Sequence, residues 1–569
     1  MTKPKKENKK SNLVSFSKDI LVSHKKSVFI STLLLIISGL LDAFGLSLIA
    51  PTVSLLIDEK GSAGFNSEII SDLKNILDFF SIPYSLRYIL ASIAIIMLIR
   101  SIFIFAQSFY LSIVQHNYTS ELGKKYHQYL NSLSWYSFKE YKQAASLNVF
   151  PESVRAGSSL RNYINLISNF FGILIYIVFL SIISFRMTIL SIMLSGFIII
   201  IFYRLIKISN ILGKQQSIKA QQIVQDLSDS LNLAKYLRTH GKTNFMAKKL
   251  FNSIDSFKSN QIKLGLNESV FHASYEYAFI GFLMLGLLIA ARFFELPSSI
   301  IALVTIILYR LFQKIKIFQQ SYQSFNKTVP GHFSIKNEIF KNQDNKDLWG
   351  NKRFSDIKKY IEFKNASFSI DNKEIFSNLN CKFEKNKINV IIGKSGSGKT
   401  SLVDLITGLT ELKKGQIKID EYSIREFSKS SFLNSIGYVD QNPFLFNDTI
   451  LNNIIWGSKG KISKNKIFNV AKDLKIHDLI NSLPKGYNSN VGDFGNSLSG
   501  GERQRIVIAR TLVNDPKILI LDEATSQLDS KSQRIVMTHL KKIKKKTTVI
   551  MVTHRKETLE IADNVLKIN

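Results

Sequence analysis

Long apolar runs occupy the first part of this 569-residue chain, whereas the remainder alternates short apolar runs with polar segments. A helix needs about 20 apolar residues to cross the hydrocarbon of a bilayer. Six segments reach that length, at residues 27–57, 85–114, 160–185, 187–208, 271–294 and 297–320. The pattern predicts an all-α membrane domain of six transmembrane helices, in which a tight turn joins the third to the fourth.

Charges at the ends of these segments predict their orientation. The stretch between the first two spans is mostly acidic, with Asp58, Glu59, Glu68, Asp72 and Asp78 against Lys60 and Lys74. The long stretches after the second and fourth spans are rich in lysine and arginine and contain no Gly/Pro-rich break. Since cationic flanks stay in the cytoplasm, we expect a multi-pass protein of the cell (inner) membrane, with helices extended into the cytoplasm and both termini on that side.

The chain is strongly basic, with a net charge of +32 and 75 Lys and Arg residues. Such a balance favours an anionic membrane surface or nucleic acid as the partner. The cations flank apolar runs and form no motif that reads bases, so we expect membrane lipid and no nucleic acid. Residues 1–26 are interpreted as a basic tail and elbow, because the apolar run that follows is too long for a secretory signal.

The pattern changes after residue 325. We assign 27–325 to the membrane domain, 326–357 to a polar linker, and 358–569 to a domain in which apolar strands alternate with helical stretches, as in a parallel α/β sheet. Val390-Ile-Ile392 leads into a complete G-x-x-x-x-G-K-[ST] phosphate-binding loop. The predicted nucleotide-binding residues there are Gly393, Lys394, Ser395, Gly396, Ser397, Gly398, Lys399, Thr400 and Ser401.

The chemistry of this loop indicates an ATPase that uses Mg²⁺. Backbone N–H groups of the glycine-rich turn surround phosphates at a helix N-terminus. Lys399 neutralises the β- and γ-phosphates, and the Thr400 hydroxyl is a Mg²⁺ ligand. Downstream, an apolar strand ends in Asp522 and Glu523. We assign Asp522 to Mg²⁺ and Glu523 to polarising the attacking water.

Leu498-Ser-Gly-Gly-Glu-Arg-Gln-Arg505 resembles the signature motif of ATP-binding cassette (ABC) proteins. The resemblance implies that Ser499, Gly500 and Gly501 contact nucleotide. It also implies a glutamine loop, with Gln441 as a Mg²⁺ ligand, and a switch histidine, His554, at the γ-phosphate. Ser526-Gln-Leu-Asp529 matches the D-loop of the family.

Six spans ahead of one ATPase domain is the arrangement of an ABC exporter half-transporter. By the same resemblance, short coupling helices are expected near 141–156 and 232–249.

Three positions depart from the family pattern. Ile370 occupies the place of the aromatic residue that stacks on adenine, so we list it as a binding residue and expect weak adenine recognition. Asp440 stands where proline commonly precedes the glutamine, and Glu502 replaces a common glutamine of the signature. None of these changes removes a hydrolytic group.

The family sandwiches each nucleotide between the phosphate loop of one ATPase domain and the signature of another. This chain carries one of each, so the resemblance implies a dimer. Because Glu523 and the signature are both intact, a homodimer is favoured over a heterodimer.

Ionisable residues inside the predicted spans bear on the cargo, because such residues usually line cavities or pair with each other. Arg100 and Arg310 are expected at similar depth, which suits a phosphate-bearing cargo. Asp42 is expected nearer the outer face, too far from Arg100 for a pair. Glu276 is the alternative partner of either arginine, in which case the arginines would be structural.

The substrate stays open at this point. The first span around Leu41-Asp-Ala-Phe-Gly45, an amphipathic segment at 65–80 and Tyr309-Arg-Leu311 resemble exporters that flip lipid-linked oligosaccharides. A pyrophosphate-linked lipid saccharide is therefore the favoured cargo. A peptide or multidrug exporter is the alternative, and an ABC ATPase that moves no solute is a third hypothesis.

Overall fold

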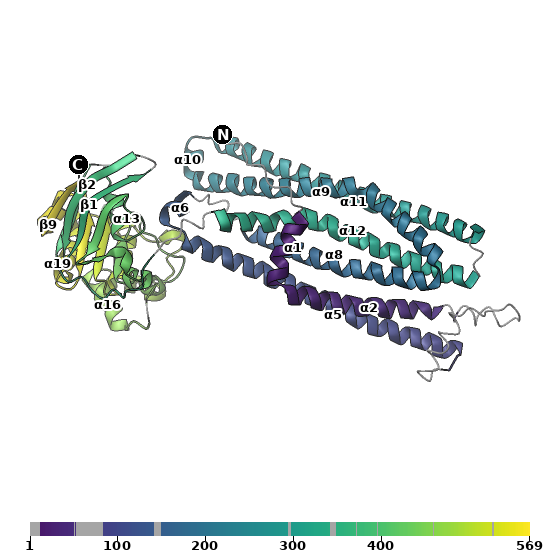
Figure 1. Ribbon diagram of the computed structural model, residues 1–569. Coiled ribbons are helices and arrows are strands. Elements are labelled where there is room, and N and C mark those ends of the chain that lie inside the picture. The colour runs from purple at the N-terminus through teal and green to yellow at the C-terminus, as the bar shows by residue number, and fades with distance from the viewer. Residues whose placement is uncertain are drawn as a thin grey trace. The chain divides into compact units, whose positions relative to one another are not determined.

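A computed structural model describes residues 12–49, 52, 83–140, 149–293, 298–341, 349–370, 373–394, 396–458, 460–525 and 528–568 (Figure 1). The chain divides into two compact units. The helical unit takes in 1–132 and 141–344, and the second unit takes in Leu133–Glu140 and Asn345–Asn569. The segment expected to be amphipathic at 65–80 lies outside the described residues.

The described part of the helical unit consists of helices, most of them long. They are α1 (Asn12–Ser23), α2 (Lys25–Ser47), α5 (Leu86–Ser132), α8 (Val149–Ile183), α9 (Phe185–Asn232), α10 (Ala234–Thr239), α11 (Thr243–Phe293) and α12 (Ser298–Lys341). With 47 residues, α5 is about 70 Å long, more than twice the hydrocarbon thickness. A single residue, Ser184, separates α8 from α9, as the tight turn required.

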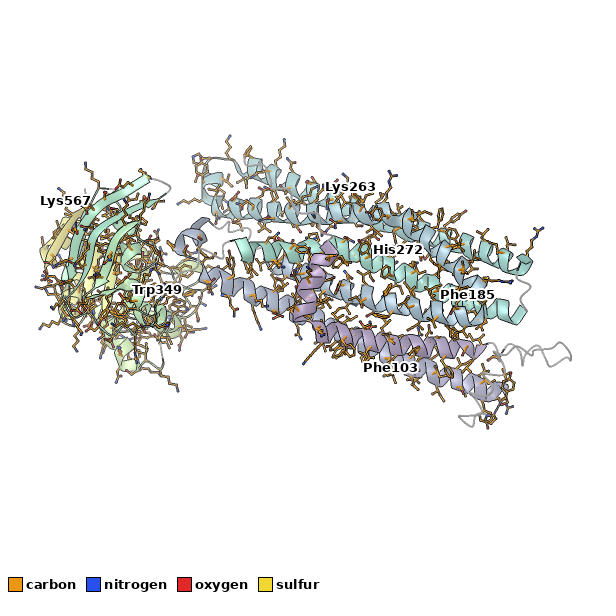
Figure 2. The ribbon with its side chains drawn as sticks, in the orientation of Figure 1. Phe103, Phe185, Lys263, His272, Trp349 and Lys567 are labelled. Atoms are coloured by element: carbon orange, nitrogen blue, oxygen red, sulfur yellow. The ribbon has the colours of Figure 1, made fainter. Side chains whose placement is uncertain are left out.

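Four of the described helices are long and apolar enough to cross a membrane, namely α2, α5, α8 and α9. The fifth and sixth expected spans fall within α11 and α12. Both are helical over their described residues, and six spans remain a prediction. Many apolar side chains of this unit are exposed. Phe105 is 71% exposed, and Phe185, which is labelled in Figure 2, is 69% exposed. Such an apolar surface suits lipid better than water.

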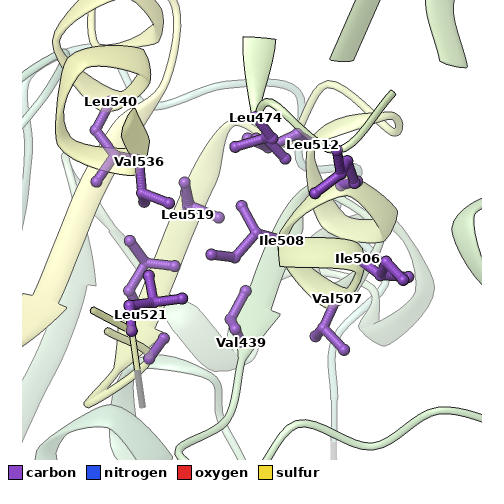
Figure 3. Close-up of a cluster of buried hydrophobic side chains, with 14 of the residues drawn as sticks. Val439, Leu474, Ile506, Val507, Ile508, Leu512, Leu519, Leu521, Val536 and Leu540 are labelled. Carbon is purple, nitrogen blue, oxygen red and sulfur yellow. The ribbon is translucent and has the colours of Figure 1, made fainter. Parts of the chain in front are cut away.

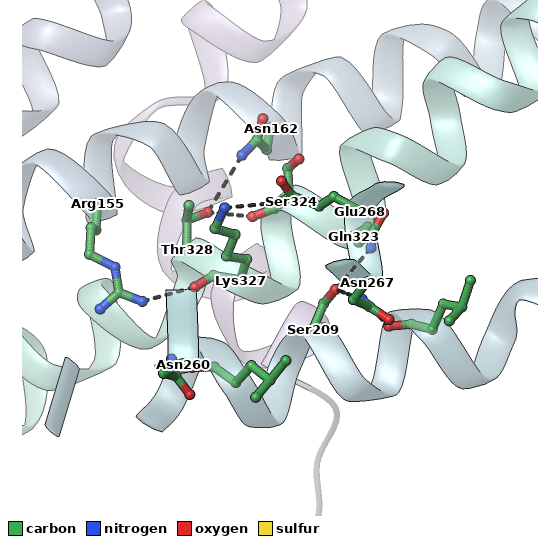
Figure 4. Close-up of polar contacts among 12 residues, drawn as sticks. Arg155, Asn162, Ser209, Asn260, Asn267, Glu268, Gln323, Ser324, Lys327 and Thr328 are labelled. Atoms are coloured by element: carbon green, nitrogen blue, oxygen red, sulfur yellow. Dashed lines mark hydrogen bonds and ion pairs between the residues drawn. The ribbon is translucent and has the colours of Figure 1, made fainter. Parts of the chain in front are cut away.

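Aromatic packing and polar contacts join the helices. Phe16 of α1 packs edge-on against Tyr163 and Phe325, with ring centroids 5.4 and 5.2 Å away. Asn267 donates a 2.8 Å hydrogen bond to Ser209 Oγ, which links α11 to α9 (Figure 4). Hydrogen bonds of this kind between helices help to fix their pairing.

Helix α12 continues into the stretch that the sequence suggested as a linker, 326–357. It ends at Lys341 and contains Pro330. Val329 is 0% and Ile335 2% exposed. The apolar face of the helix is thus still buried beyond residue 325, which favours its continuation despite the polar composition.

Short helices occur near the expected coupling positions, with one difference. Residues 149–156 are the first turns of α8, and 141–148 lie outside the described residues. The short helix before them is α6 (Trp135–Glu140), which is grouped with the second unit. A side chain at Gly331 of α12 would approach Glu152 O to 2.9 Å, so close packing holds the start of α8 against α12. The second coupling helix was expected near 232–249, and the short helix α10 lies within that range.

The described part of the second unit contains two sheets, of which the parallel one was predicted from the sequence and the antiparallel one was not. An antiparallel sheet has the order β2-β1-β4-β5 and a parallel sheet the order β6-β7-β8-β3-β9. The strands are β1 (Tyr360–Ile370), β2 (Lys373–Glu384), β3 (Ile388–Gly393), β4 (Lys414–Ile419), β5 (Tyr422–Ser423), β6 (Ile436–Val439), β7 (Ile518–Asp522), β8 (Thr548–Val552) and β9 (Asn564–Ile568). The functional residues follow β3, β6, β7 and β8.

Helices surround the parallel sheet. They are α13 (Lys399–Ile406), α14 (Lys429–Leu433), α15 (Ile450–Ile455), α16 (Lys464–Asp473), α17 (His477–Ser482), α18 (Gly500–Leu512) and α19 (Ser530–Ile543), with 3₁₀ turns at Ile424–Glu426, Gly486–Asn488, Asp493–Gly495 and Lys556–Ile561. Figure 3 shows Ile508 of α18 beside Leu519 of β7 and Val439 of β6, all fully buried. This packing fixes the strand ends that carry the site.

Candidate nucleotide site and membrane charge cluster

The phosphate-binding loop lies between β3 and α13, as predicted. Gly398 is the N-cap of α13 and has a φ of 91°, a conformation that favours glycine. A side chain there would also approach Ile375 Cγ2 to 2.4 Å. Lys399 Nζ donates hydrogen bonds to Gly393 O at 3.1 Å and Lys394 O at 2.9 Å, so its ammonium lies over the loop.

The other loop residues follow this geometry. Gly396 has a φ of 81°, Thr400 is exposed in the first turn of α13, and Ser401 is half-buried beside it. Ser397 Oγ is buried without a hydrogen-bond partner in the described part of the chain. Ser395 lies outside that part. The loop therefore presents a lysine, hydroxyls and helix N–H groups together, which is an arrangement suited to phosphate.

Three adjacent parallel strands bring the predicted hydrolytic residues together. Gln441 follows β6, Glu523 follows β7 and His554 follows β8. Gln441 Nε2 donates to Glu523 Oε2 at 2.8 Å, and His554 Nε2 lies 2.8 Å from Glu523 Oε1. Ligands of parallel α/β sheets bind at this carboxyl edge. Three of the predicted site residues, Gln441, Glu523 and His554, are therefore in contact with one another.

Glu523 is held by its backbone as well as by its side chain. Its φ is 49°, which is uncommon for a residue with a Cβ, and its N–H donates to Val552 O at 3.0 Å. Strained backbone of this kind persists where the surrounding structure enforces it. The carboxylate thus stands at a fixed place on the sheet edge.

Asp522 is the last residue of β7 and is only 5% exposed. Burial, and then the negative charges of Asp440 and Glu523, raise the pKa of its carboxyl to about 6. Asp404 contributes in the same direction, while the Lys399 ammonium opposes it. Several carboxylates thus lie near Asp522. One of them is Asp440, which is among the three departures from the family pattern.

The signature residues form the start of α18. Ser499 is its N-cap, and Gly500 and Gly501 are its first two residues. Ser499 Oγ accepts from the Glu502 N–H at 3.3 Å, and Ser499 N donates to Glu502 Oε2 at 2.8 Å. This reciprocal pair is a capping box, in which glutamate and glutamine are interchangeable. The capping box explains why Glu502 fits in place of glutamine.

Ile370 ends β1 and is 37% exposed, so its side chain is accessible to a ligand. The neighbouring aromatic residue Phe368 is 7% exposed and packs against Phe376, with ring centroids 6.0 Å apart. Phe368 therefore belongs to the core of the unit. The structure thus leaves Ile370 as the exposed side chain at the end of this strand.

In the helical unit, Arg100 and Arg310 meet at one carboxylate. Asp42 is 1% exposed, and its Oδ1 lies 3.1 Å from Arg100 Nε. Its Oδ2 lies 4.0 Å from Arg310 Nε and accepts a hydrogen bond from the Tyr176 hydroxyl. The expectation that Asp42 lies too far from Arg100 is wrong. The depth estimate neglected the reach of the arginine side chain and the packing of α2 against α5, where a side chain at Gly45 would clash with Met97.

Glu276 does not pair with either arginine. Its carboxylate lies 2.8 Å from Lys316 Nζ and its side chain is 70% exposed, so this pair is a surface contact. The alternative in which Glu276 holds the arginines is therefore wrong, although its premise that an acid pairs with them is correct. The acid is Asp42.

Sequence reasoning missed two members of this cluster, Tyr176 and Lys314. Lys314 interacts electrostatically with Asp42, Arg100 and Arg310. It follows Arg310 by four residues, a spacing that places two side chains on one helix face and could have revealed it. Nothing in the pattern singled out Tyr176. Two arginine side chains thus meet one carboxylate, a formal excess of one positive charge.

Comparisons with known proteins agree with this description. A family model described as ABC transporter matches residues 376–526. The ATP-dependent lipid A-core flippase of Syntrophus aciditrophicus is 42% identical over 210 residues, which cover 37% of this chain and 35% of the flippase. P-glycoprotein 14 of Caenorhabditis elegans is 40% identical over 218 residues, 38% of this chain and 16% of that protein. The match thus spans about a third of the flippase and less of P-glycoprotein 14.

A solved structure extends the likeness to nearly the whole chain. The structure of a bacterial Atm1-family ABC exporter with ATP bound has a TM-score of 0.78 and covers 96% of this chain and 94% of its own. Its sequence identity of 21% makes this a likeness of fold.

Proposed function

We propose that this protein hydrolyses ATP to export or flip a substrate across a membrane, because residues 376–526 match an ABC transporter model and the fold resembles that of a bacterial ABC exporter. The favoured cargo is a lipid with a phosphate or pyrophosphate group, such as a lipid-linked oligosaccharide. The observation that carries this choice is the excess of positive charge around Asp42.

Hydrolysis is assigned to the edge of the parallel sheet. Glu523 polarises the attacking water, and its contacts with Gln441 and His554 orient the carboxylate. His554 is proposed to contact the γ-phosphate. Lys399 neutralises charge on the transferred group, because its ammonium already lies over the phosphate loop.

The donor set fits Mg²⁺. Thr400, Gln441 and Asp522 offer a hydroxyl, an amide oxygen and a carboxylate, which are the hard oxygen ligands that Mg²⁺ prefers. Among the described residues no group of three or more His, Cys, Asp or Glu side chains could hold a metal ion. Held by Thr400, Gln441 and Asp522, Mg²⁺ would neutralise charge on the phosphates of ATP. The raised pKa of Asp522 supports this role, since its buried anion is poorly neutralised without a cation.

Arg100 and Arg310 are proposed to hold the anionic group of the cargo. Asp42 positions both guanidiniums but neutralises only one charge, which leaves capacity for a second anion. Guanidinium forks bind phosphate oxygens in pairs. The relatives named lipid A-core flippases lend support to a lipid cargo. A multidrug or peptide substrate is the second candidate, because a relative named Multidrug resistance protein 1, from Entamoeba histolytica, is 40% identical.

We propose that the protein works as a homodimer in the cell (inner) membrane, with the ATPase domain and both termini in the cytoplasm. The support is that the chain carries one phosphate loop and one signature, both with intact geometry. A heterodimer with a related chain is the alternative arrangement.

The test uses the purified protein in sealed proteoliposomes. A polyprenyl-pyrophosphate saccharide should stimulate ATP hydrolysis and be flipped, whereas a neutral lipid of equal chain length should do neither. Replacing both arginines by glutamine would strand the buried Asp42 carboxylate, so the informative variant combines Asp42→Asn with Arg100→Gln and Arg310→Gln. It should retain basal hydrolysis and lose stimulation. Arg204→Gln, at an exposed position of α9, is the matched control.

Stimulation that survives in the triple variant would contradict the phosphate role. Export of apolar drugs by the unmodified protein, without a response to the lipid pyrophosphate, would favour the multidrug reading. ATP hydrolysis without movement of any solute would favour an ATPase that is not a transporter.

A further inference from the structure

The second unit contains a hollow of about 1080 Å³ whose walls come from α16, α18, α19 and the turns beside them. Its described lining residues all belong to this unit. Six of them are cationic, namely Lys472, Lys475, Arg505, Lys531, Arg534 and Lys542. Two of them are acidic, Asp473 and Asp529, so the walls carry a formal excess of four positive charges.

Within the described part of the chain these six cations form no ion pair, and the two acids have other partners. Asp529 caps α19 and accepts a hydrogen bond from a backbone N–H at 3.1 Å. Asp473 Oδ2 lies 3.4 Å from His539 Nδ1. A lysine close by in the sequence but outside the hollow behaves differently, since Lys544 pairs with Asp563 at 2.7 Å. The cations of the hollow are therefore available to an anion from outside the chain.

The backbone brings these cations together from three helices. Arg505 Nη1 donates to Lys475 O at 3.3 Å, which ties α18 to the residue beyond the C-cap of α16. Lys475 has a φ of 52°, a conformation that favours glycine, yet a lysine stands there and lines the hollow. Lys531, Arg534 and Lys542 recur at a spacing that places them along one face of α19.

We propose that this hollow binds a compact small molecule that carries several phosphate groups. Guanidinium forks pair with phosphate oxygens, and lysine ammonium groups add point charges. The volume is comparable to the upper end of the range of about 300–1,000 Å³ that is usual for small-molecule sites. The excess of four positive charges matches several phosphates better than one.

The shape of the site favours a compact ligand over a nucleic acid. A nucleic acid spaces its phosphates along a strand, and proteins bind it with cations that follow an extended groove. Here the cations line a single hollow. None of the residues predicted to bind ATP or Mg²⁺ lines it. The inference therefore goes beyond the proposed transport activity and does not rest on the identity of the cargo.

The probe is inositol hexakisphosphate, in which every ring carbon carries a phosphate, added to the full-length protein in phosphatidylcholine nanodiscs. Isothermal titration calorimetry at about 0.15 M salt limits long-range attraction by surface charge. The probe should bind once per chain. Inorganic phosphate should bind at least about tenfold more weakly, because one group engages fewer cations. A single-stranded RNA of equal charge should also bind more weakly.

Variants test whether the hollow itself holds the probe. Lys475→Gly combined with Arg534→Gln should reduce the affinity about tenfold or more, the effect of losing charge-assisted hydrogen bonds. This variant should fold normally, because glycine favours the backbone at position 475 and Arg534 is exposed. Thermal unfolding checks the fold. Lys531→Gln combined with Lys542→Gln removes two other cations and should have a similar effect.

The matched control is Lys413→Gln combined with Lys414→Gln, which removes the same charge at exposed positions outside the hollow. It should bind the probe as the unmodified protein does. An equal loss in this control would overturn the proposal, since net charge alone would then attract the probe.

Three further results would also overturn it. Absence of probe binding to the unmodified protein is the first. Loss of binding in Lys399→Ala is the second, because the probe would then occupy the phosphate loop. The third is tighter binding of the RNA that is lost in the Lys475→Gly and Arg534→Gln variant, which would assign the hollow to a nucleic acid.

Discussion

At the edge of the parallel sheet, Glu523 lies between Gln441 and His554, whereas in the helical unit Asp42 lies between Arg100 and Arg310. Both carboxylates have two partners, but their surroundings differ. The Glu523 side chain is 23% exposed and that of Asp42 is 2% exposed. The backbone positions Glu523, because this residue follows the end of β7 and has a positive φ. Asp42 depends on charges contributed by other helices.

This difference indicates what each cluster loses when its acid is removed. The sheet keeps its shape without the Glu523 charge, so the expected loss is in chemistry. Four helices contribute to the cluster at Asp42, and a buried charge without its partner is costly. The expected loss there is in stability. Four predictions test this contrast, from the largest expected effect to the smallest.

Glu523→Gln should reduce ATP turnover by about 10²–10⁴-fold, the usual effect of removing a general base. ATP binding and thermal stability should stay unchanged, because glutamine has the same shape. Phosphate release and equilibrium nucleotide binding measure the two effects. Glu502→Gln is the control, since glutamine preserves the capping box. Near-normal turnover in Glu523→Gln would assign the role to another group.

Asp42→Asn should destabilise the helical unit by about 3–5 kcal/mol, because it leaves two arginines without their carboxylate. Thermal unfolding of the detergent-solubilised protein measures this loss. Adding Arg100→Gln should restore part of it. Glu276→Gln breaks an exposed pair with Lys316 and should change the unfolding temperature little. Equal effects of Asp42→Asn and Glu276→Gln would remove the contrast between the clusters.

Ile370→Tyr should tighten ATP binding by about fivefold, since stacking of an aromatic ring on a base contributes about 1–3 kcal/mol. Titration with a fluorescent ATP analogue gives the affinity. Ile370→Leu should bind as the unmodified protein does. Phe368 is in the core and is no substitute for a stacking ring. Unchanged affinity in Ile370→Tyr would place the adenine elsewhere.

Asp440→Asn should shift the pH dependence of Mg²⁺ binding. A proton on Asp522 competes with the metal, and its pKa is about 6, so Mg²⁺ affinity weakens as the pH falls through that value. Removing the Asp440 charge lowers this pKa and moves the weakening to lower pH, by a fraction of a unit. Mg²⁺ titrations between pH 5 and about 8 would reveal the shift. An unchanged profile would mean that burial and the charges of Glu523 and Asp404 set the pKa of Asp522 without Asp440.

Much of the ATPase site was predictable from the sequence, because its motifs are local. The phosphate loop, the signature and the two acids after β7 each depend on a short run of residues whose backbone geometry follows from glycine positions, caps and strand ends. Parallel strands then bring the ends of such runs to one edge. The roles of these residues stay predictions, but their proximity required only the topology.

Only the tertiary structure decided the partners in the helical unit. An apolar helix has a similar composition on every face, so the sequence does not determine which face meets which neighbour. That is why Asp42 was assigned no arginine, Tyr176 was missed, and Glu276 was given the wrong partner. The continuation of α12 past residue 325 was likewise settled by buried apolar contacts, at Val329 and Ile335. The amino-acid order determined which functional residues stand at the ends of the strands. The packing of helices that are distant in the sequence determined which charged side chains of the helical unit pair with each other.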